Sequence, residues 1–409
     1  MVAALVLLSL LCVWSLVAKR LARWSITAPI AFAAAGVVLT GGDRPALALG
    51  METHTFQTGV ELVLAVMLFT DATEARGYER LGKTVGEGRL LALALPGSVA
   101  LAVLFGALLF PGTNWWLLAV AALVVMPMDL APVLMFLRDE RLPLRVRAAL
   151  NIEGGFNDGL ISPFFVFCVA NLLTVEGETF GDLVLNAAEG AAYAVLAGAT
   201  VGVLAGRLMP WCLRAGWASA SELRLAGLAL PFLAYAGSVQ LGGNGFVAAF
   251  VAGLCYAHVA RTLGHDNLDL VYDIGHLMAL AVWFTFGALI AEEFAHGVDL
   301  KVIAYALLAL TVARMLPVCA ALTGTRFSWA ERGAVGWLGS RGVTSIVFAV
   351  LAYSQLPYDD AAFVVKVTCA TVLLSVLLHG VTLEPLARWF ARRPRADGPR
   401  AAAPERSEP

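Results

Sequence analysis

The sequence predicts an all-α, polytopic membrane protein. Of its 409 residues, 60% are hydrophobic and only 14% are charged, and the mean hydropathy is +0.80. A water-soluble domain is about 45–50% apolar and about 25% charged, so this excess of apolar residues indicates a lipid environment. The ten-residue stretches of alternating hydrophobicity that would form a membrane β-barrel do not occur in the chain.

Charge and cysteine content exclude several other classes of protein. The formal net charge is −2 at pH 7, so the overall charge does not indicate a nucleic-acid partner. The 6 cysteines lie far apart, and the chain has no CxxC motif or Cys/His cluster of the kind that binds zinc. We therefore expect neither disulfides nor a structural metal, and no cofactor.

Apolar stretches that can span a bilayer recur along the whole chain. A helix needs roughly 20 mainly apolar residues to cross the hydrocarbon core. About thirteen stretches meet this requirement, and they lie near 2–18, 25–40, 56–73, 88–110, 115–137, 147–173, 184–209, 222–241, 244–260, 273–291, 300–322, 331–354 and 361–386. The first lacks a basic segment before it, which favours a retained helix over a signal peptide.

The distribution of basic residues predicts the orientation of these spans. Of the 28 lysines and arginines, 23 fall on one side of the membrane when the spans are numbered in this way, and only Arg44 and Lys301 fall in loops on the other side. Because short basic loops stay in the cytoplasm, the N-terminus is predicted to lie outside and the C-terminus inside.

An odd number of spans allows a symmetric division of the chain. Six helices, one linker helix and six more helices place the second six upside down relative to the first, as in the inverted repeats of secondary transporters. The predicted units are a first repeat over 1–175, the linker helix over 176–215, a second repeat over 216–390 and a disordered cytoplasmic tail over 391–409.

Corresponding spans of the two repeats carry residues that break helices. The fifth span reads VVMPMDLAPVLMF, with prolines on both sides of Asp129, and the twelfth reads VGWLGSRGVTS, with glycines around Arg341. Proline removes a backbone donor, and glycine weakens a helix by about 1 kcal/mol relative to alanine. The sequence therefore predicts two broken helices, whose freed backbone groups are tolerated at midplane only where they line a cavity.

Ionisable residues within the spans are candidates for function, because a charge at the bilayer centre costs from about 2.5 to roughly 10 kcal/mol or more. The ionisable set comprises Asp71, Asp129, Glu153, Asp158, Arg314 and Arg341, and the polar Asn157 accompanies it in the sixth span. The acids outnumber the arginines, so ion pairs are expected and one or two carboxylates remain spare. A spare carboxylate in a partly wetted site holds either a proton or a monovalent cation, and this competition is the simplest mechanism for antiport.

Structural roles are the alternative for most of these residues. Glu153 paired with an arginine would fix the register of the helices. Asp129, between prolines, would cap the N-terminus of a half-helix. Asp71, near the inner end of its span, would be interfacial. Asp158 is the residue that is hardest to explain by a structural role.

The polar motifs, in their order along the chain, resemble those of a known family. They are LFTDA at 68–72, MDxxP at 128–132, EGGFND at 153–158, GNGFVAAFVAGL at 243–254, WFTFGAL at 283–289, VAR at 312–314, SRG at 340–342 and LLHGVT at 377–382. With these motifs the sequence resembles the monovalent cation:proton antiporters, particularly the bacterial NhaP-type branch related to sodium/proton exchangers. The most specific motif is EGGFND, which is similar to the family's ESxxND signature.

The resemblance covers nearly all of residues 1–390 and implies the NhaA-like antiporter fold. It also implies a homodimer in the inner (plasma) membrane, with a mobile six-helix core and a dimerisation domain. By the same resemblance Asp158 binds the ion, and Asn157 beside it marks the branch that is usually electroneutral. Asp129 falls on the aspartate of the unwound helix.

The remaining charged residues also match family positions. The structural glutamate–arginine pair falls on Glu153 with Arg314, the alternative partner being Arg341. Asp71 sits where some members have an acidic residue near the ion. These matches assign structural roles to the glutamate and the arginines and a role near the ion to Asp71.

Two positions depart from the family pattern. The family usually has threonine before the aspartate of the fifth span, where this chain has Met128, and serine after the glutamate of the sixth, where it has Gly154. Both changes remove a hydroxyl that could ligate a cation. The Met128 backbone carbonyl remains a candidate ligand and water could replace the second oxygen, so the choice of cation stays open.

The sequence thus predicts a secondary antiporter that exchanges Na⁺, or alternatively Li⁺ or K⁺, for H⁺ at Asp158. The absence of a P-loop argues against ATP drive, and the absence of a nucleophile elbow or a metal-binding histidine pair argues against a membrane enzyme. Two rival functions remain: a cation channel or sensor on the same scaffold, and a proton-coupled symporter whose organic anion is held by Arg314 or Arg341.

Overall fold

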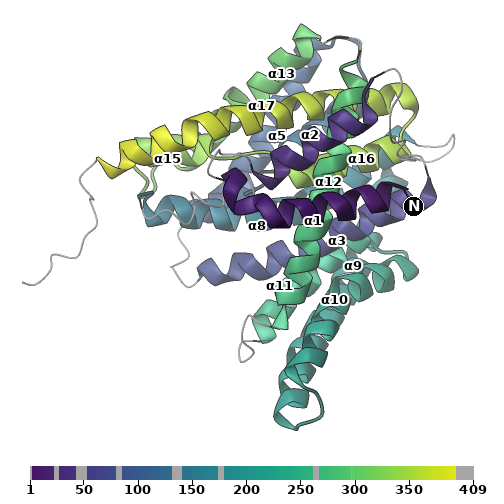
Figure 1. Ribbon diagram of the computed structural model, residues 1–409. Coiled ribbons are helices and arrows are strands. Elements are labelled where there is room, and N and C mark those ends of the chain that lie inside the picture. Colours follow the sequence, from purple (N-terminus) through teal and green to yellow (C-terminus); the bar gives the residue numbers. More distant parts are fainter. Residues whose placement is uncertain are drawn as a thin grey trace, which may run out of the picture.

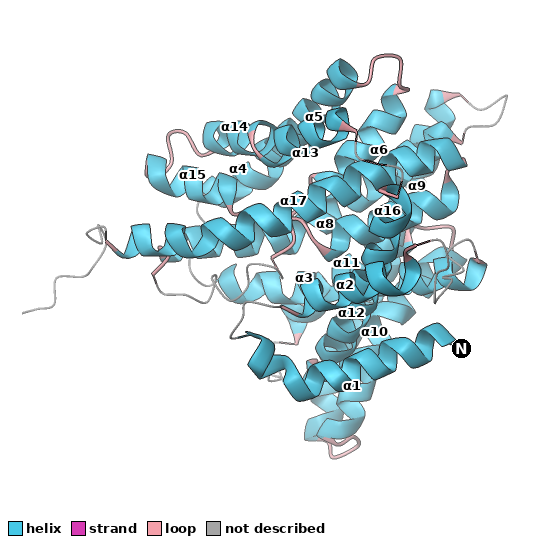
Figure 2. Cartoon of the chain, turned by 45° about the horizontal axis from the view of Figure 1, so that its top comes forward, coloured by secondary structure: helices cyan, strands magenta, loops and turns pink. Residues whose placement is uncertain are grey.

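The computed structural model describes residues 2–22, 27–42, 53–79, 85–130, 141–173, 179–260, 267–295, 297 and 299–392. Within these ranges all regular structure is helical, as predicted (Figure 2). Eight of the described helices are long and apolar enough to cross a membrane, and four shorter apolar helices accompany them. Of the predicted tail over 391–409, all but the first two residues lie outside the described part of the chain.

The helices follow one another along the chain with connections that are mostly short. The first half contains α1 (Val2–Ala22), α2 (Ala28–Thr40), α3 (His54–Glu79), α4 (Val85–Arg89), the π-helix η1 (Leu90–Ala94), α5 (Leu95–Leu109), α6 (Trp115–Val125), α8 (Leu144–Leu172) and α9 (Phe180–Arg214). The second half contains α10 (Ala220–Gln240), α11 (Gly245–Val259), α12 (Asp269–Glu293), α13 (Leu300–Leu310), α14 (Val312–Ala321), α15 (Trp329–Trp337), α16 (Val343–Gln355) and α17 (Tyr358–Ala391).

The predicted spans other than the fifth fall on a described helix or on helices in line, with ends that differ by a few residues; the fifth, 115–137, coincides with α6 only as far as Val125, and its residues 131–137 lie outside the described part of the chain. The two predicted breaks are confirmed. In the fifth span α6 ends at Val125, and the chain continues without helix over 126–130, where the description stops until 141. In the twelfth span residues 338–342 separate α15 from α16.

Two irregularities within the spans were not predicted. The fourth span contains the π-helical turn η1, and the eleventh is divided at Thr311 into α13 and α14. A π-turn keeps its residues apolar and helical, so the hydrophobic pattern of the sequence does not reveal it. The two irregular spans pack together: a β-carbon placed on Gly97 of α5 would lie 3.2 Å from the Cβ of Pro317 in α14.

A row of glycines brings α9 and α11 into close contact. Gly198, Gly202 and Gly206 recur every four residues and therefore share one face of α9. A β-carbon at Gly202 would lie 2.8 Å from the Cβ of Cys255, and one at Gly206 would lie 2.8 Å from the Cβ of Val259. Small residues at this spacing let helices pack closely in a membrane. Figure 1 shows α9, α10 and α11 together on the lower side of the molecule.

The half-helices α6 and α16 lie in the interior. Every residue of α16 from Val343 to Ala352 is buried, and so is most of α6. Both are mainly apolar around their circumference, which is the pattern of an enclosed helix. Helices α3, α8, α12 and α17 pack around them and contribute to the same apolar cluster. This arrangement places both helix breaks inside the protein.

Candidate ion-binding site

The two helix breaks meet and satisfy each other's backbone groups. The N–H of Asp129 donates to the carbonyl oxygen of Ser340 at 2.8 Å, and the Ser340 hydroxyl donates to the carbonyl oxygen of Asp129 at 2.5 Å. Pro127 has no N–H, so its position in the fifth span already lacks a helical hydrogen bond. Buried backbone groups must be paired. The place where the two helix breaks meet is called the crossing, and there each broken helix supplies hydrogen-bond partners to the other.

Asp129 caps the second half-helix. Its Oδ2 accepts a hydrogen bond from the N–H of Val343, the first residue of α16, at 2.6 Å. Gly342 makes room for the carboxylate, because a β-carbon there would lie 2.9 Å from Cγ of Asp129. A carboxylate at a helix N-terminus also interacts favourably with the helix dipole. The capping geometry considered from the sequence is thus present, with the refinement that the capped helix belongs to the other broken span.

Glu153 and Arg314 form a buried ion pair between α8 and α14. Both guanidinium Nη atoms contact the carboxylate, with Nη2 2.8 Å from Oε2. Each residue is only 1% exposed. Gly339, beside the second break, lies against the guanidinium, since a β-carbon there would be 2.7 Å from Nε of Arg314. The pair therefore supports the backbone at the crossing.

Arg341 has a different environment from Arg314. It is 0% exposed, and its Nη1 donates to the carbonyl oxygen of Pro127 at 3.2 Å. Its Nε and Nη2 have no hydrogen-bond partner among the described residues. The side-chain hydrogen bond of Arg341 joins the two helix breaks. The carboxylate of Glu153 is hydrogen-bonded to Arg314 instead.

Helix α17 holds the second break from its other side. The hydroxyl of Ser375 accepts a hydrogen bond from the N–H of Arg341 at 2.8 Å. One turn further along α17, Nε2 of His379 lies 2.6 Å from the carbonyl oxygen of Trp337, the last residue of α15. These contacts explain how a stretch that includes two glycines keeps a defined path.

Asn157 and Asp158 lie beside the crossing, and each keeps one oxygen unpaired. Nδ2 of Asn157 donates to the carbonyl oxygen of Met128 at 2.9 Å, and the hydroxyl of Thr344 donates to Oδ2 of Asp158 at 2.6 Å. The Oδ1 atoms of both residues are buried and have no hydrogen-bond partner among the described residues. Such oxygens are rare in folded proteins; both call for a water or an ion, and the carboxylate of Asp158 can take a proton instead.

Thr344 is a site residue that the sequence analysis did not identify. It is 2% exposed and belongs to the first turn of α16, directly after the second break. The sequence contained a usable signal, because a hydroxyl residue immediately following a predicted midplane break faces the site formed by that break. Met128 and Gly154 bring no hydroxyl to the site, and Thr344 provides one from α16.

The other predicted residues occupy the border of the site. Met128 is buried; its carbonyl oxygen accepts from Asn157, and its sulfur lies 3.3 Å from Nη2 of Arg314. Asp71, half-buried in α3, is close enough to Asp158 and Asp129 for electrostatic repulsion. The crossing therefore brings the predicted residues together, with Asp71 on an adjacent helix.

Glycines of α8 permit close packing around the site. A β-carbon at Gly154 would lie 2.8 Å from Cδ1 of Leu130, just after Asp129 in the first break. At Gly159 the side chain of Phe250 from α11 occupies the space that a β-carbon would need. The absence of side chains at these positions lets α8 approach the first break and α11.

Comparison with known proteins now identifies the family. The family model described as sodium/hydrogen exchanger, transmembrane, matches residues 6–389. The chain belongs to this family. Its members are transporters rather than enzymes, and the apolar helices of this chain agree with a membrane protein that crosses the bilayer several times.

Individual relatives are distant. The K⁺/H⁺ antiporter NhaP2 of Shewanella sp. MR-4 is 26% identical over 90% of this chain and 63% of its own length. The K⁺/H⁺ antiporter NhaP of Alkalimonas amylolytica is 25% identical over 66% of this chain and 46% of its own length. The chain thus spans less than two thirds of the length of these curated relatives.

A solved structure shares the fold. The sodium proton antiporter MjNhaP1 from Methanocaldococcus jannaschii aligns with a TM-score of 0.72 and 20% sequence identity, covering 93% of this chain and 99% of its own. The antiporter fold expected from the sequence is therefore confirmed. The names of the relatives differ in the cation, K⁺ in the first two and sodium in the third.

Proposed function

We propose that this chain is a secondary antiporter that exchanges a monovalent cation for H⁺ at Asp158. The observation that carries the proposal is the pair of unpaired Oδ1 atoms of Asn157 and Asp158. A buried carboxylate with one oxygen unpaired and no cationic partner is costly, so a proton or a cation must neutralise it. A site that accepts one or the other, and not both together, couples the flow of the two ions.

Alternating access completes the cycle. In our proposal the site opens to one side of the membrane at a time. This happens when α6, α15 and α16, the helices that end at the crossing, move against α9, α10 and α11. Asp158 releases its proton on one side, binds the cation there and returns with it to the other side. The network around Asp129 and Ser340 keeps the crossing intact during this movement.

The cation is proposed to be Na⁺, with Li⁺ and K⁺ as alternatives. Hard cations bind oxygen atoms, and the available protein oxygens are Oδ1 of Asp158, Oδ1 of Asn157 and the hydroxyl of Thr344. The Met128 carbonyl oxygen already accepts one hydrogen bond and has one further lone pair. This small set leads us to propose that the cation keeps part of its water shell, so that selectivity among the three ions is weak.

The exchange is proposed to be electroneutral. Glu153 is neutralised by Arg314, and Asp129 caps α16, which leaves Asp158 as the one carboxylate that cycles between proton and cation. Each direction of the cycle then moves a single positive charge. Asp71 is the residue that could add a second proton, because it lies within electrostatic range of Asp158.

Location and assembly follow the same reasoning. We propose a homodimer in the plasma membrane, with the N-terminus outside and the C-terminus in the cytoplasm. The asymmetry of basic residues supports this orientation. We also keep the division into repeats over 1–175 and 216–390, joined by a linker helix over 176–215, which corresponds to α9 in the structure.

The two rival functions receive less support. An organic-anion symporter would need an accessible arginine, and Arg314 is paired with Glu153 while Arg341 is 0% exposed. A channel or sensor would have no need for a carboxylate that must be neutralised at every turnover. Neither rival accounts for the unpaired oxygen of Asp158.

Transport in proteoliposomes tests the proposal directly. Vesicles with an acidic interior and an internal pH-sensitive dye receive Na⁺, Li⁺ or K⁺ outside, and proton efflux is recorded as alkalinisation of the interior. We expect efflux with at least one of these cations and none with choline. Cation conductance without proton movement would indicate a channel, and indifference to all three cations would favour the symporter.

A further inference from the structure

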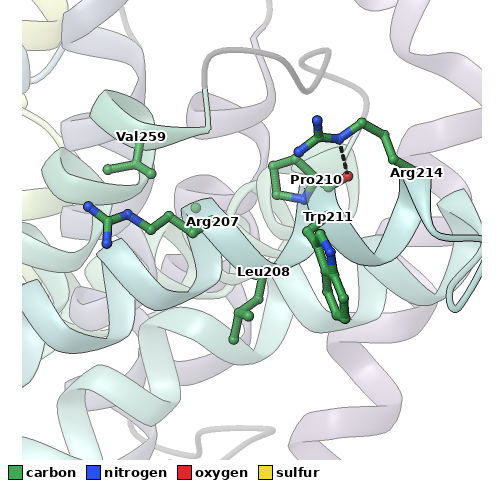
Figure 3. Close-up of a pocket in the computed structure, with 7 residues that line it drawn as sticks. Arg207, Leu208, Pro210, Trp211, Arg214 and Val259 are labelled. Carbon is green, nitrogen blue, oxygen red and sulfur yellow. Dashed lines mark hydrogen bonds between the residues drawn. The ribbon is translucent and has the colours of Figure 1, made fainter.

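A recess lies at the end of α9, away from the ion site (Figure 3). It arises because α11 ends at Val259, opposite Gly206, whereas α9 continues for two more turns to Arg214. The recess measures about 530 Å³ and is lined by Leu208, Pro210 and Trp211 together with Arg207, Arg214 and Val259. This volume is enough for a polar headgroup and the first carbons of a chain.

The charge of the recess is positive. Arg207 and Arg214 are both exposed, and the described residues that line the recess include no acid. Nε of Arg214 donates to the carbonyl oxygen of Pro210 at 3.2 Å, which turns the guanidinium back toward Pro210, whereas the Arg207 side chain extends toward Val259, as Figure 3 shows. Guanidinium groups are suited to phosphate because their planar donors match its oxygens.

The recess lies at a membrane–water boundary. Residues 190–206 of α9 contain no charged side chain, and this run of 17 residues is about 26 Å long at 1.5 Å per residue. That length approaches the roughly 30 Å of the hydrocarbon core. Arg207 is therefore the first charged residue where α9 leaves the membrane, on the side that the basic residues predict to be cytoplasmic.

An apolar track leads from the recess into the membrane. Leu204, Leu208 and Trp211 lie on one face of α9 because they are spaced by four and three residues. All three are exposed, at 51%, 52% and 44%. Tryptophan is favoured at the level of lipid headgroups. The surface thus has a cationic end, which matches the phosphate of a phospholipid, followed by an apolar stripe, which matches its acyl chain.

We propose that this recess binds an anionic phospholipid, with its phosphate at the cationic end that Arg207 and Arg214 form and an acyl chain along Leu204 and Leu208. A soluble phosphate would gain nothing from the apolar stripe. A second copy of the chain presenting the same recess would bring like charges together, since a two-fold contact repeats each residue. The bound lipid joins the end of α9 to the end of α11 at the Gly206–Val259 contact.

The test measures lipid binding rather than transport, so it does not depend on the proposed exchange. The purified chain in a neutral detergent is titrated with phosphatidylglycerol, with phosphatidylcholine and with glycerol phosphate, while bound lipid is counted by native mass spectrometry and Tm is recorded. We expect phosphatidylglycerol to bind and raise Tm. Phosphatidylcholine and glycerol phosphate should do neither at equal concentration.

Variants assign the binding to the recess. Arg207→Gln or Arg214→Gln should weaken binding of phosphatidylglycerol roughly fivefold, and the double variant roughly thirtyfold, as expected for about 1 kcal/mol per basic residue at a membrane surface. Arg224→Gln is the matched control, because Arg224 is an exposed arginine of α10 that does not line the recess. If the double variant cannot be purified, the two single variants carry the test.

Several results would overturn the proposal. Equal binding of phosphatidylcholine would mean that the apolar stripe holds any lipid. A rise in Tm with glycerol phosphate would mean that the recess binds a soluble anion rather than a lipid. A loss with Arg224→Gln as large as with Arg207→Gln would indicate diffuse surface charge. A lower mass of the lipid-free Arg207→Gln particle would show that a second copy occupies the surface.

Discussion

Glu153 and Asp158 lie five positions apart on α8, and both are buried carboxylates, but their surroundings differ. Glu153 engages Arg314 with both oxygens. Asp158 accepts one hydrogen bond from Thr344, and its other oxygen has no partner among the described residues. Burial alone therefore does not distinguish a structural acid from one that binds an ion. We propose that the unpaired oxygen makes the distinction, and the following changes test it.

The largest effect is expected at Asp158. Asp158→Asn removes the group that takes up either ion, so proton efflux driven by Na⁺ should fall to the level of empty vesicles. The variant should still insert and keep a near-normal Tm, because the amide retains the shape of the side chain and an oxygen that accepts from Thr344. Exchange at the rate of the unmodified protein would remove Asp158 from the mechanism.

At Glu153 the expected effect is on stability. Glu153→Gln leaves Arg314 as an uncompensated buried charge, which should lower the free energy of unfolding by roughly 3–5 kcal/mol. Denaturation in detergent measures this loss, and cation affinity should change less. A double-mutant cycle with Arg314→Gln should show strong coupling, and the matched cycle with Arg341→Gln should show little. Additive losses in both cycles would contradict the pairing.

A smaller effect is expected at Thr344. Thr344→Val keeps the shape of the side chain but removes the hydrogen bond to the Asp158 carboxylate, which should weaken apparent cation affinity about tenfold, or ~1.4 kcal/mol. The concentration of Na⁺ that gives half-maximal exchange measures this change. The matched control is Ser345→Ala, because the buried Ser345 hydroxyl has no partner in the described part of the chain. Equal effects of the two variants would exclude a specific role for Thr344.

The smallest expected effect is that of membrane potential. If Asp158 alone cycles, the exchange carries no net charge, and a potential set by potassium and valinomycin should leave the rate of Na⁺-driven exchange unchanged. Each net charge moved would otherwise add about 2.3 kcal/mol per 100 mV. A rate that rises several-fold with potential would mean that a second acid titrates. Loss of that increase in Asp71→Asn would identify the acid as Asp71.

Much of the fold was predictable because lipid imposes simple rules on a sequence. Apart from the end of the fifth span after Val125, the predicted spans fall on helix in the described part of the chain, and the breaks occur where Pro127 and the glycines around Arg341 remove helical stability. The π-turn at Leu90–Ala94 and the division at Thr311 were not predictable, since both keep the apolar pattern of an ordinary helix.

The sequence by itself determined which residues are costly in a membrane, and therefore which residues to examine. It did not determine which partners they have. Glu153 could have paired with Arg314 or Arg341, and Asp129 could have been a ligand or a cap; the tertiary structure pairs the first with Arg314 and places the second at α16. The contact between Thr344 and Asp158 was likewise decided by the tertiary structure. Hydrogen bonds depend on distances of a few ångströms between residues more than a hundred positions apart, and only the packing of helices fixes such distances.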